Sequence, residues 1–591
     1  RRTARQRACS LRRAGSRGQL PRPFGQSRTR LAAVRGKVED MKKLKHITHS
    51  GITAIALFLF LITSCTKLED TSYNQIISSE FVPEISDLPA LTGAPYVDWR
   101  GLLLQWNTVY RAQEVSGDQM LTPARPNGWV DGGVYRRIHE HKWTNEDDIV
   151  INIWTRAYKG ITNCNRIIYQ VETEQIPVEA EDAGPLIAEM KLLRASFYWI
   201  LCDLYGNVPI VDSFDVPEGF LPQQNTRKEV YDFIIKDLIE NIPLVSEESN
   251  QTTYGKFNKW AGLSLLAKMY LNAEVYSGTA EWNNCIETCN TIINSGKFSL
   301  ESNQKNVFIT ENQNSKEIIF ALPFDSKYVS EWNSFDVHMQ TLDPGNQKTY
   351  NLEYSPWGGV CAVPQFISTF DTLDSRYIDN YIKGYQYAAN GDPIIASMGD
   401  WAGKHLFFRN YVAGVDKSDE VDGFRLGKFE IAMGASNRLS NDWPLFRYAD
   451  VLMMKAECLL RTGHADEAAT IVTEVRARNF KSNPEKGVVT GDQLMSGSTY
   501  DYGLRNHLES TYEGGADIQY GRFLDELGWE FCQEARRRTD MVRFGVFTNK
   551  SWLSHSPNGD YRALYPIPGT EIAKNRSEER RVGKECIYRW W

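Results

Sequence analysis

Residues 442–463 read DWPLFRYADVLMMKAECLLRTG, and this stretch decides the fold. Its apolar residues recur every three or four positions, which is the spacing of one face of an α-helix. Asp442 can cap the N-terminus, Pro444 fits a first turn, and Gly463 can end the helix. The sequence therefore predicts one helix over 442–463. Its buried stripe would consist of Leu445, Tyr448, Ala449, Leu452, Met453, Ala456 and Leu459.

The same periodicity recurs along much of the chain. Residues 466–478 are predicted to form the antiparallel partner of the first helix, and 524–543 to form the last helix. Upstream helices are predicted over 98–122, 149–171, 185–205, 228–242, 257–276 and 282–294. Helix pairs of this size, with small and aromatic residues on the packing face, resemble tetratricopeptide units, although the 34-residue consensus is not kept. We therefore expect a mainly α fold built from degenerate tetratricopeptide-like helix pairs.

The periodicity fades between residues 301 and 440. Short strand-like runs such as 317–322 lie there among Gly, Pro, Asn and Asp. A structureless loop of this length is unusual inside a compact domain. The segment is therefore predicted to be an irregular α+β insertion, and such insertions are common places for a binding surface.

The N-terminal region has the three parts of a secretory signal. Basic residues follow Met41, an apolar run covers 52–62, and Thr63-Ser64 precede Cys65. The apolar run is shorter than the roughly 20 residues of a membrane span. A cysteine at this place resembles a bacterial lipobox, so we expect 41–64 to be a signal peptide, Cys65 to be lipidated and 65–80 to be a tether. An ordinary signal peptide with an incidental cysteine is the alternative.

The two ends of the chain differ from the rest. Residues 1–40 carry 12 Lys or Arg and 2 acids, and we expect them to be upstream sequence translated by mistake. A basic arm that binds nucleic acid is the alternative. Residues 576–591 form a charged run without an apolar period and resemble adaptor sequence read in frame, so we expect a non-native tail.

Charge excludes one class of partner. Residues 1–64 and 576–591 hold 20 of the 67 Lys and Arg but only 5 of the 74 acidic residues, so the remaining chain has a formal charge near −22 rather than −7. A field of that sign repels phosphate backbones. Nucleic acid is therefore not expected as a partner.

The cysteines are predicted to pack in the core rather than to form disulfides or bind a metal. Seven of them, at 164, 202, 285, 289, 361, 458 and 532, lie between the lipobox and the tail, and no CxxC pair occurs. An odd number without pattern does not suggest a disulfide framework, so most are predicted to be core thiols. Cys285 and Cys289 stand one helical turn apart, but no further metal ligands lie nearby. Neither a metal nor a cofactor is expected.

No enzyme signature was found. The motifs GxSxG, HExxH, GxGxxG and the P-loop are all missing from the sequence. Carboxylates are plentiful, but no spacing singles out an acid/base pair. His139 and His141 are predicted to lie on a polar surface segment, and residues 536–538, Arg-Arg-Arg, on a solvated helix face with one inward arginine. We therefore expect a protein that binds without catalysing a reaction.

Several motifs resemble those of the SusD/RagB family of outer-membrane nutrient-binding lipoproteins. They are the stretch 443–452 with Ala456, Glu457 and Gly463; FDTLDSR at 370–376; the 524–545 segment; and LYPIP at 564–568 with Glu571-Ile572. The resemblance covers about 65–575, with an N-terminal helical region over 81–300 and a C-terminal region over 301–575. One departure is Gln533-Glu534-Ala535, where the family commonly has Gly and an aromatic residue.

The resemblance implies a function. A SusD-like protein would be a cell-surface lipoprotein of the outer membrane that acts in starch or polysaccharide utilisation. It would sit as a lid on a SusC-type TonB-dependent transporter, bind an oligosaccharide and take part in nutrient uptake. The alternatives are a lid that binds peptides, a helical-repeat scaffold without a ligand, and a lipoprotein hydrolase.

Aromatic residues supply the candidate binding site. An aromatic face suits the apolar face of a sugar, and neighbouring polar groups suit its hydroxyls. Four tryptophans lie in loop-like contexts and are predicted to contact a ligand: Trp129, Trp332, Trp357 and Trp401. Asp118 and Arg125 lie close to Trp129 in sequence and complete the predicted site. Five others sit on helical stripes and are predicted to be core: Trp154, Trp199, Trp260, Trp443 and Trp529.

Overall fold

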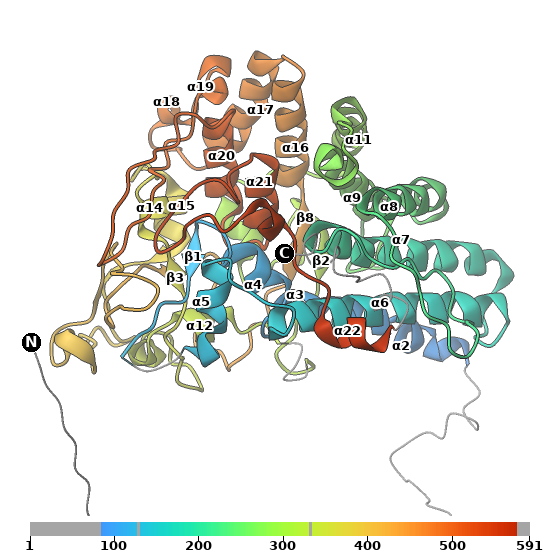
Figure 1. Ribbon diagram of the computed structural model, residues 1–591, viewed down its shortest axis with the longest axis horizontal. Coiled ribbons are helices and arrows are strands. Elements are labelled where there is room, and N and C mark those ends of the chain that lie inside the picture. Colours follow the sequence, from blue (N-terminus) through green and yellow to red (C-terminus); the bar gives the residue numbers. More distant parts are fainter. Residues whose placement is uncertain (1–83, 127–129, 330–333, 576–591) are drawn as a thin grey trace, which may run out of the picture. The chain divides into compact units, whose positions relative to one another are not determined.

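The computed structural model describes residues 84–126, 130–329 and 334–575. The predictions for the signal peptide, Cys65, the tether and the C-terminal tail lie outside these ranges. Helices dominate the described part, as the periodicity predicts (Figure 1). No helix within these ranges combines the length and the apolarity that crossing a bilayer requires.

The N-terminal half consists of antiparallel helices. They are α2 (Leu88–Thr92), α3 (Ala94–Leu104), α4 (Val109–Glu114), α5 (Val134–His139), α6 (Asp148–Glu172), α7 (Ala180–Leu204), α8 (Arg227–Asn241), α9 (Lys259–Leu271), α10 (Ala273–Ser277) and α11 (Trp282–Asn294). Helix α6 packs on α3 and α7, α7 on α8, and α9 on α11. Gly160 lets α6 and α7 approach closely, because a Cβ there would lie 2.2 Å from the ring of Phe197.

Two of the predicted helices are interrupted. The stretch 98–122 contains the end of α3, a turn at 105–108 and the short α4, with Asn107 at a φ of 53°. The stretch 257–276 breaks at Asn272, between α9 and α10. Apolar residues resume at helical spacing after both breaks, so the periodicity alone did not reveal them.

The C-terminal half returns to helix pairs. They are α16 (Tyr448–Arg461), α17 (Ala465–Ala477), α18 (Pro484–Gly487), α19 (Gly491–Met495), α20 (Gly521–Phe531), α21 (Arg537–Arg543) and α22 (Gly569–Lys574). Helix α16 packs on α17 and on α11, and therefore joins the two halves (Figure 1).

The prediction of a single helix over 442–463 was wrong in its first turn. Residues Trp443–Arg447 form strand β8, and α16 begins only at Tyr448. Strand β8 pairs antiparallel with β2 (Ile318–Leu322). Asp442 does not cap the helix; its carboxylate accepts hydrogen bonds from the Phe324 N–H and the Tyr254 hydroxyl. These partners lie more than 100 residues away, so the local pattern carried no sign of them.

The predicted last helix is also divided. Helices α20 and α21 are separated by residues 532–536, in which Gln533 and Ala535 have φ values of 67° and 61°. Glycine adopts this region more easily than residues with a Cβ. The break therefore falls at the positions where the SusD-like pattern commonly has glycine and this chain does not.

The segment between β2 and β8 is irregular. It contains α12 (Val337–Thr341), α13 (Gln347–Tyr350), α14 (Pro364–Ile367) and α15 (Ser375–Asp379). Short antiparallel pairs link β1 (Met120–Leu121) with β3 (Cys361–Ala362), β4 (Tyr381–Ile382) with β7 (Arg425–Leu426), and β5 (Gly384–Tyr385) with β6 (Phe407–Phe408). The predicted α+β insertion is therefore confirmed.

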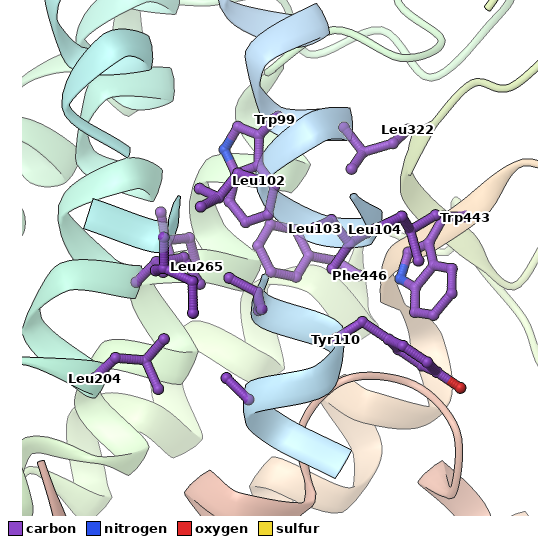
Figure 2. Close-up of a cluster of buried hydrophobic side chains, with 14 of the residues drawn as sticks. Trp99, Leu102, Leu103, Leu104, Tyr110, Leu204, Leu265, Leu322, Trp443 and Phe446 are labelled. Atoms are coloured by element: carbon purple, nitrogen blue, oxygen red, sulfur yellow. The ribbon is translucent and has the colours of Figure 1, made fainter. Parts of the chain in front are cut away.

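One continuous hydrophobic core joins both halves. Figure 2 shows Trp99, Leu102 and Leu103 of α3 facing Leu265 of α9 and Phe446 of β8. All seven cysteines of the described ranges are buried and free, although only most of them were predicted to be core thiols. Trp154, Trp260, Trp443 and Trp529 are buried and Trp199 is half-buried, in agreement with their predicted place in the core.

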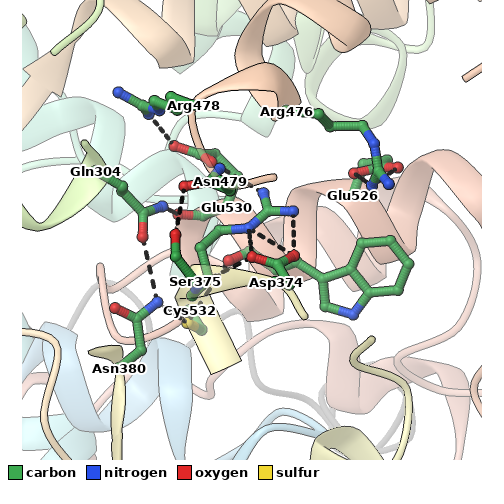
Figure 3. A network of polar contacts seen from close by, with 12 residues as sticks. Gln304, Asp374, Ser375, Asn380, Arg476, Arg478, Asn479, Glu526, Glu530 and Cys532 are labelled. Atoms are coloured by element: carbon green, nitrogen blue, oxygen red, sulfur yellow. Dashed lines mark hydrogen bonds and ion pairs between the residues drawn. The ribbon is translucent and has the colours of Figure 1, made fainter. Parts of the chain in front are cut away.

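A buried ionic cluster lies where the insertion meets the C-terminal helices. Arg447 Nη1 lies 2.8 Å from Glu317 Oε1 and 2.9 Å from Glu530 Oε1, and Arg376 Nη1 lies 3.0 Å from Glu530 Oε2. Arg478 also pairs with Glu317. It pairs with Glu530 as well, and both of these residues are labelled in Figure 3. Burial alone would raise the pKa of Glu530, but Arg478, Arg447 and Arg376 outweigh it and hold the pKa well below the ordinary value. The glutamate is therefore ionised in the folded state.

Two polar segments are more buried than the sequence indicated. Arg536, Arg537 and Arg538 all pair with carboxylates, so the prediction of a solvated face with one inward arginine was wrong. His139 and His141 are 0% exposed, so the prediction of a polar surface segment was also wrong. Ring nitrogens of the two imidazoles lie within hydrogen-bond distance of the backbone oxygens of Val115, Leu553 and Ser116, which act as acceptors and which a single sequence does not reveal.

The histidine cluster predicts a loss of stability in acid. His139, His141 and His555 are buried among aromatic rings, and burial lowers all three pKa values, that of His141 to about 3. The unfolded chain, with histidine pKa values near 6.5, binds these protons first. The histidine contribution to stability is therefore present above about pH 6.5 and is lost as the pH falls toward 3, by about 1.4 kcal/mol per pH unit for each fully neutral histidine.

His141→Phe isolates this term, because the ring of His141 stacks on Phe547 with 4.1 Å between centroids and phenylalanine keeps the stack. We expect the urea unfolding free energy of the wild type to fall more steeply between pH 6 and pH 4 than that of the variant. Equal slopes would contradict the assignment.

Because of the ionic cluster, we expect one isosteric substitution to lower the free energy of unfolding strongly. Glu530→Gln removes the charge that three arginines share, and leaving a buried charge unpaired typically costs about 3–5 kcal/mol. Denaturant unfolding at pH 7 measures the loss. Glu485→Gln, at an exposed position, should change stability by less than about 0.5 kcal/mol. A Glu530→Gln loss as small as that of the control would show that the cluster is not a major constraint.

Candidate functional site

The candidate site is a pair of tryptophans at the surface. Trp106 lies in the turn after α3 and is 39% exposed, and Trp357 lies in the loop before β3 and is half-buried. Their ring centroids are 5.5 Å apart, and their planes are tilted by 54°. The next aromatic residue along the loop, Tyr354, is 49% exposed. The two indoles therefore form an aromatic pair at the surface.

The loop that carries Trp357 is held by backbone hydrogen bonds. The Trp357 N–H donates to the Met339 carbonyl at 2.7 Å, and the Gly359 N–H donates to the Gln340 carbonyl at 2.9 Å. Helix α12 therefore fixes this loop.

A carboxyl group contacts one ring of the aromatic pair. The side chain of Trp106 hydrogen-bonds to Asp336. Burial raises the pKa of Asp336 to about 6, although Arg111 and the hydrogen bonds from Gln340 and Trp106 oppose the rise. Asp336 is 6% exposed, so its main effect is to orient the Trp106 ring.

Arg125 holds the backbone beside the aromatic pair. It is 7% exposed, and its Nε donates to the Gly359 carbonyl at 3.1 Å, behind Trp357. Its Nη1 donates to the Asp419 carbonyl at 2.9 Å. The carboxylate of Asp419 accepts from the Asp400 N–H, next to Trp401. Arg125 therefore connects the loops of two predicted tryptophans, and in this structure it acts as a positioning residue rather than as an exposed ligand contact.

Trp401 has cations over its ring. Lys404 Nζ lies 4.7 Å from the ring centroid, and Arg409 Cζ lies 5.5 Å from it. The ring also packs against the small apolar cluster of the β5–β6 hairpin. Its face is therefore less open to a sugar than the Trp106–Trp357 pair.

The position of Asp118 corrects its predicted role. Asp118 is 0% exposed, and its carboxylate oxygens lie 2.7 Å and 2.9 Å from Arg537 Nε and Nη2. The Tyr502 hydroxyl also donates to it at 2.7 Å. All of its bonding capacity is directed inward, so it ties the N-terminal half to α21 and does not face a ligand. The nearby prolines and glycines in the sequence had wrongly suggested an exposed loop.

Two predicted residues, Trp129 and Trp332, lie outside the described ranges. Trp106 was not among the predicted ligand contacts, because it lies within the predicted helix 98–122. Helix α3 ends at Leu104, and Trp106 lies in the turn that follows, just before Asn107 with its positive φ of 53°.

A cavity lies beside the C-terminal end of the described chain. This cavity has a volume of about 720 Å³ and is bounded by three segments, 143–158, 205–224 and 561–575. Its size is in the range of ligand pockets. Sequence reasoning missed it, because it forms between segments that are far apart in the chain.

The described residues show no arrangement for metal chemistry. No three His, Cys, Asp or Glu side chains gather there in a way that would hold a metal ion. The Trp106–Trp357 pair can contribute ring stacking and hydrogen bonding.

Comparisons with known proteins identify related chains. A family model described as starch-binding associating with outer membrane matches residues 106–271, and a model described as SusD family matches residues 316–589. The starch-binding protein SusD of Bacteroides thetaiotaomicron is 24% identical over 521 residues, which cover 81% of this chain and 85% of that protein. SusD-like protein P25 of Formosa agariphila is 24% identical over 555 residues, which cover 89% of this chain and 97% of that protein.

A solved structure shows the same fold. Surface glycan-binding protein A from Bacteroides thetaiotaomicron, in complex with laminarihexaose, matches with a TM-score of 0.62 at 17% identity. The match covers 84% of this chain and 98% of that chain.

Proposed function

Because the chain belongs to the SusD/RagB family, we propose that it binds an oligosaccharide on the Trp106–Trp357 surface and passes it to a transporter without breaking a bond. The observation that carries the proposal is the exposed, tilted pair of indoles, 5.5 Å apart, on a loop fixed by α12. Indole faces suit the apolar faces of sugar rings. Relatives named for starch binding and for a laminarihexaose complex support a glycan as the ligand class.

The cellular setting belongs to the same proposal. The protein would be an outer-membrane lipoprotein anchored through Cys65, with 65–80 as its tether, and would face the outside of the cell. It would act as the lid of a SusC-type TonB-dependent transporter. The family description of association with the outer membrane supports this location. Trp129, Trp332 and Trp401 are kept in the proposal as further ligand contacts.

The negative charge of the chain narrows the class of glycan that we expect it to bind. Without its two atypical ends the chain carries a charge near −22, and a field of that sign disfavours anionic polymers. A neutral glycan is therefore proposed rather than a uronic acid polymer.

Alanine variants of the aromatic pair test the site. Trp106→Ala and Trp357→Ala should each weaken glycan binding about tenfold, which is the loss expected from about 1.4 kcal/mol of ring contact. Affinity electrophoresis and calorimetry with starch and laminarin measure the change, and circular dichroism checks the fold.

Tyr512→Ala is the matched control, because Tyr512 is an aromatic residue that is 82% exposed and belongs to the separate 501–514 loop. Its binding should equal that of the wild type. If the wild type binds no neutral glycan and instead retains a peptide mixture, the cargo is peptide. If glycan binding survives both tryptophan changes, the site lies elsewhere.

A further inference from the structure

The cavity between segments 143–158, 205–224 and 561–575 has a volume of about 720 Å³ and shares no lining residue with the Trp106–Trp357 surface. Its wall combines aromatic rings, aliphatic side chains, neutral polar groups and a few charges. Pockets of roughly 300–1,000 Å³ hold small ligands. The cavity is therefore a separate place for a ligand of limited size.

Two accessible rings line the cavity. Tyr561 is 41% exposed, and Tyr158 is half-buried. The Tyr158 hydroxyl donates to the Pro209 carbonyl at 2.7 Å, and the Tyr158 ring contacts the Trp154 ring with 4.8 Å between centroids. Rings that are held in place suit the apolar face of another ring, such as that of a sugar.

One cation of the cavity wall lacks a counter-ion. The guanidinium of Arg562 lies against two rings, with its Cζ 5.5 Å from the centroid of Trp143 and 4.9 Å from that of Tyr561. Its Nη1 donates to the Trp143 carbonyl, but no carboxylate of the described residues pairs with it, and its Nε has no hydrogen-bond partner among them. Arginine is rarely buried without a charged partner, and Arg562 is only 9% exposed. The carboxylate of a ligand matches the fork of donors that a guanidinium presents.

The other charges of the wall leave a place for a single anion. Glu571 and Lys574 pair with each other, with 2.8 Å between Oε1 and Nζ, so the lining has one positive charge in excess. The charge of the chain near −22 repels a polyanion, but salt screens that field beyond about 8 Å. At contact distance the charge of Arg562 dominates, and the cavity therefore suits one carboxylate rather than many.

Amide groups complete the wall. The Asn145 side chain forms no hydrogen bond with another described residue. Asn207 Oδ1 accepts from the Arg227 N–H, and Gln224 Nε2 donates to the Asn207 carbonyl, which leaves the second polar atom of each amide available to a ligand. Amides donate and accept hydrogen bonds, as sugar hydroxyls do. An acyl chain or an aromatic acid would leave these groups unused.

We propose that this cavity binds the uronic acid residue of a short oligosaccharide, which is a sugar ring with one carboxylate. The carboxylate pairs with Arg562, the apolar face of the ring lies on Tyr561, and the hydroxyls bond the amides of Asn145 and Gln224. The assignment does not rest on the proposed glycan surface, because the two places share no residue.

Three matched small ligands test the proposal on the full chain. The methyl glycoside of glucuronic acid carries the carboxylate, the methyl glycoside of glucose has a hydroxymethyl group in its place, and cyclohexanecarboxylate keeps ring and charge without the hydroxyls. Titrations followed by NMR should give a Kd of about 1 mM for the glucuronide. The glucoside should bind at least about tenfold more weakly, because it loses a charge-assisted hydrogen bond. Cyclohexanecarboxylate should also bind at least about tenfold more weakly, because it leaves the amides unpaired.

Arg562→Gln removes the charge, keeps an N–H donor and should weaken glucuronide binding at least about tenfold. Arg505→Gln is the matched control, because Arg505 Cζ also lies 4.9 Å from a tyrosine centroid, that of Tyr512, but on a separate loop. It should leave binding unchanged. Circular dichroism checks that the variants fold. Tyr561→Ala, at an exposed position, should weaken glucuronide binding at least about threefold and serves as the test if Arg562→Gln does not fold.

The glycan surface provides an independent readout. Trp357→Ala should leave glucuronide binding intact, and Arg562→Gln should leave starch and laminarin binding intact, so either proposal can fail without the other. The uronic acid proposal is overturned if the wild type shows no saturable binding of the glucuronide up to about 20 mM. It is also overturned if the glucoside or cyclohexanecarboxylate binds as tightly as the glucuronide. Wild-type binding of the glucuronide by folded Arg562→Gln, or by Tyr561→Ala, would overturn it as well.

Discussion

The charge on Glu530 is the constraint on which the rest of the structure depends. It lies on α20 with 0% exposure, and it pairs with arginines from β8, from α15 and from the residue after α17. Charges removed from water are tolerated only when their partners are in place. The cluster therefore requires the end of the insertion and the C-terminal helices to meet in one arrangement, and it places β8 beside β2. The core around Trp99 and Phe446 forms on that frame (Figure 2).

The candidate site is held by buried polar contacts of its own. Arg125 joins the Trp357 loop to the Asp419 segment, and α12 holds the loop from the other side. The aromatic surface is thus built on irregular backbone that is fixed by buried polar groups. A loop held in this way keeps its rings in position before a ligand arrives, which reduces the entropy lost on binding.

Helix pairs could be predicted from the sequence because a helix stripe is a local property. The spans of α6, α8, α11 and α17 agree with the predicted ones to within about two residues, which is the usual uncertainty of helix ends. Where distant partners determine the secondary structure, the prediction from the local pattern was wrong. Trp443–Arg447 is a strand because β2 pairs with it. Asp118 and His141 are polar residues whose partners lie hundreds of residues away or in another element, so their burial left no local trace. For Trp106 the helix periodicity was correct, but the helix ended two residues earlier.

The buried thiols have a consequence for handling the protein. Burial raises the pKa of Cys164, Cys202, Cys285, Cys361, Cys458 and Cys532, so these groups rarely form the thiolate that exchanges with disulfides. The described fold is held by packing and ion pairs, with all seven of its cysteines free. A reducing agent therefore has no disulfide to break among the described residues, and their packing does not depend on a covalent cross-link.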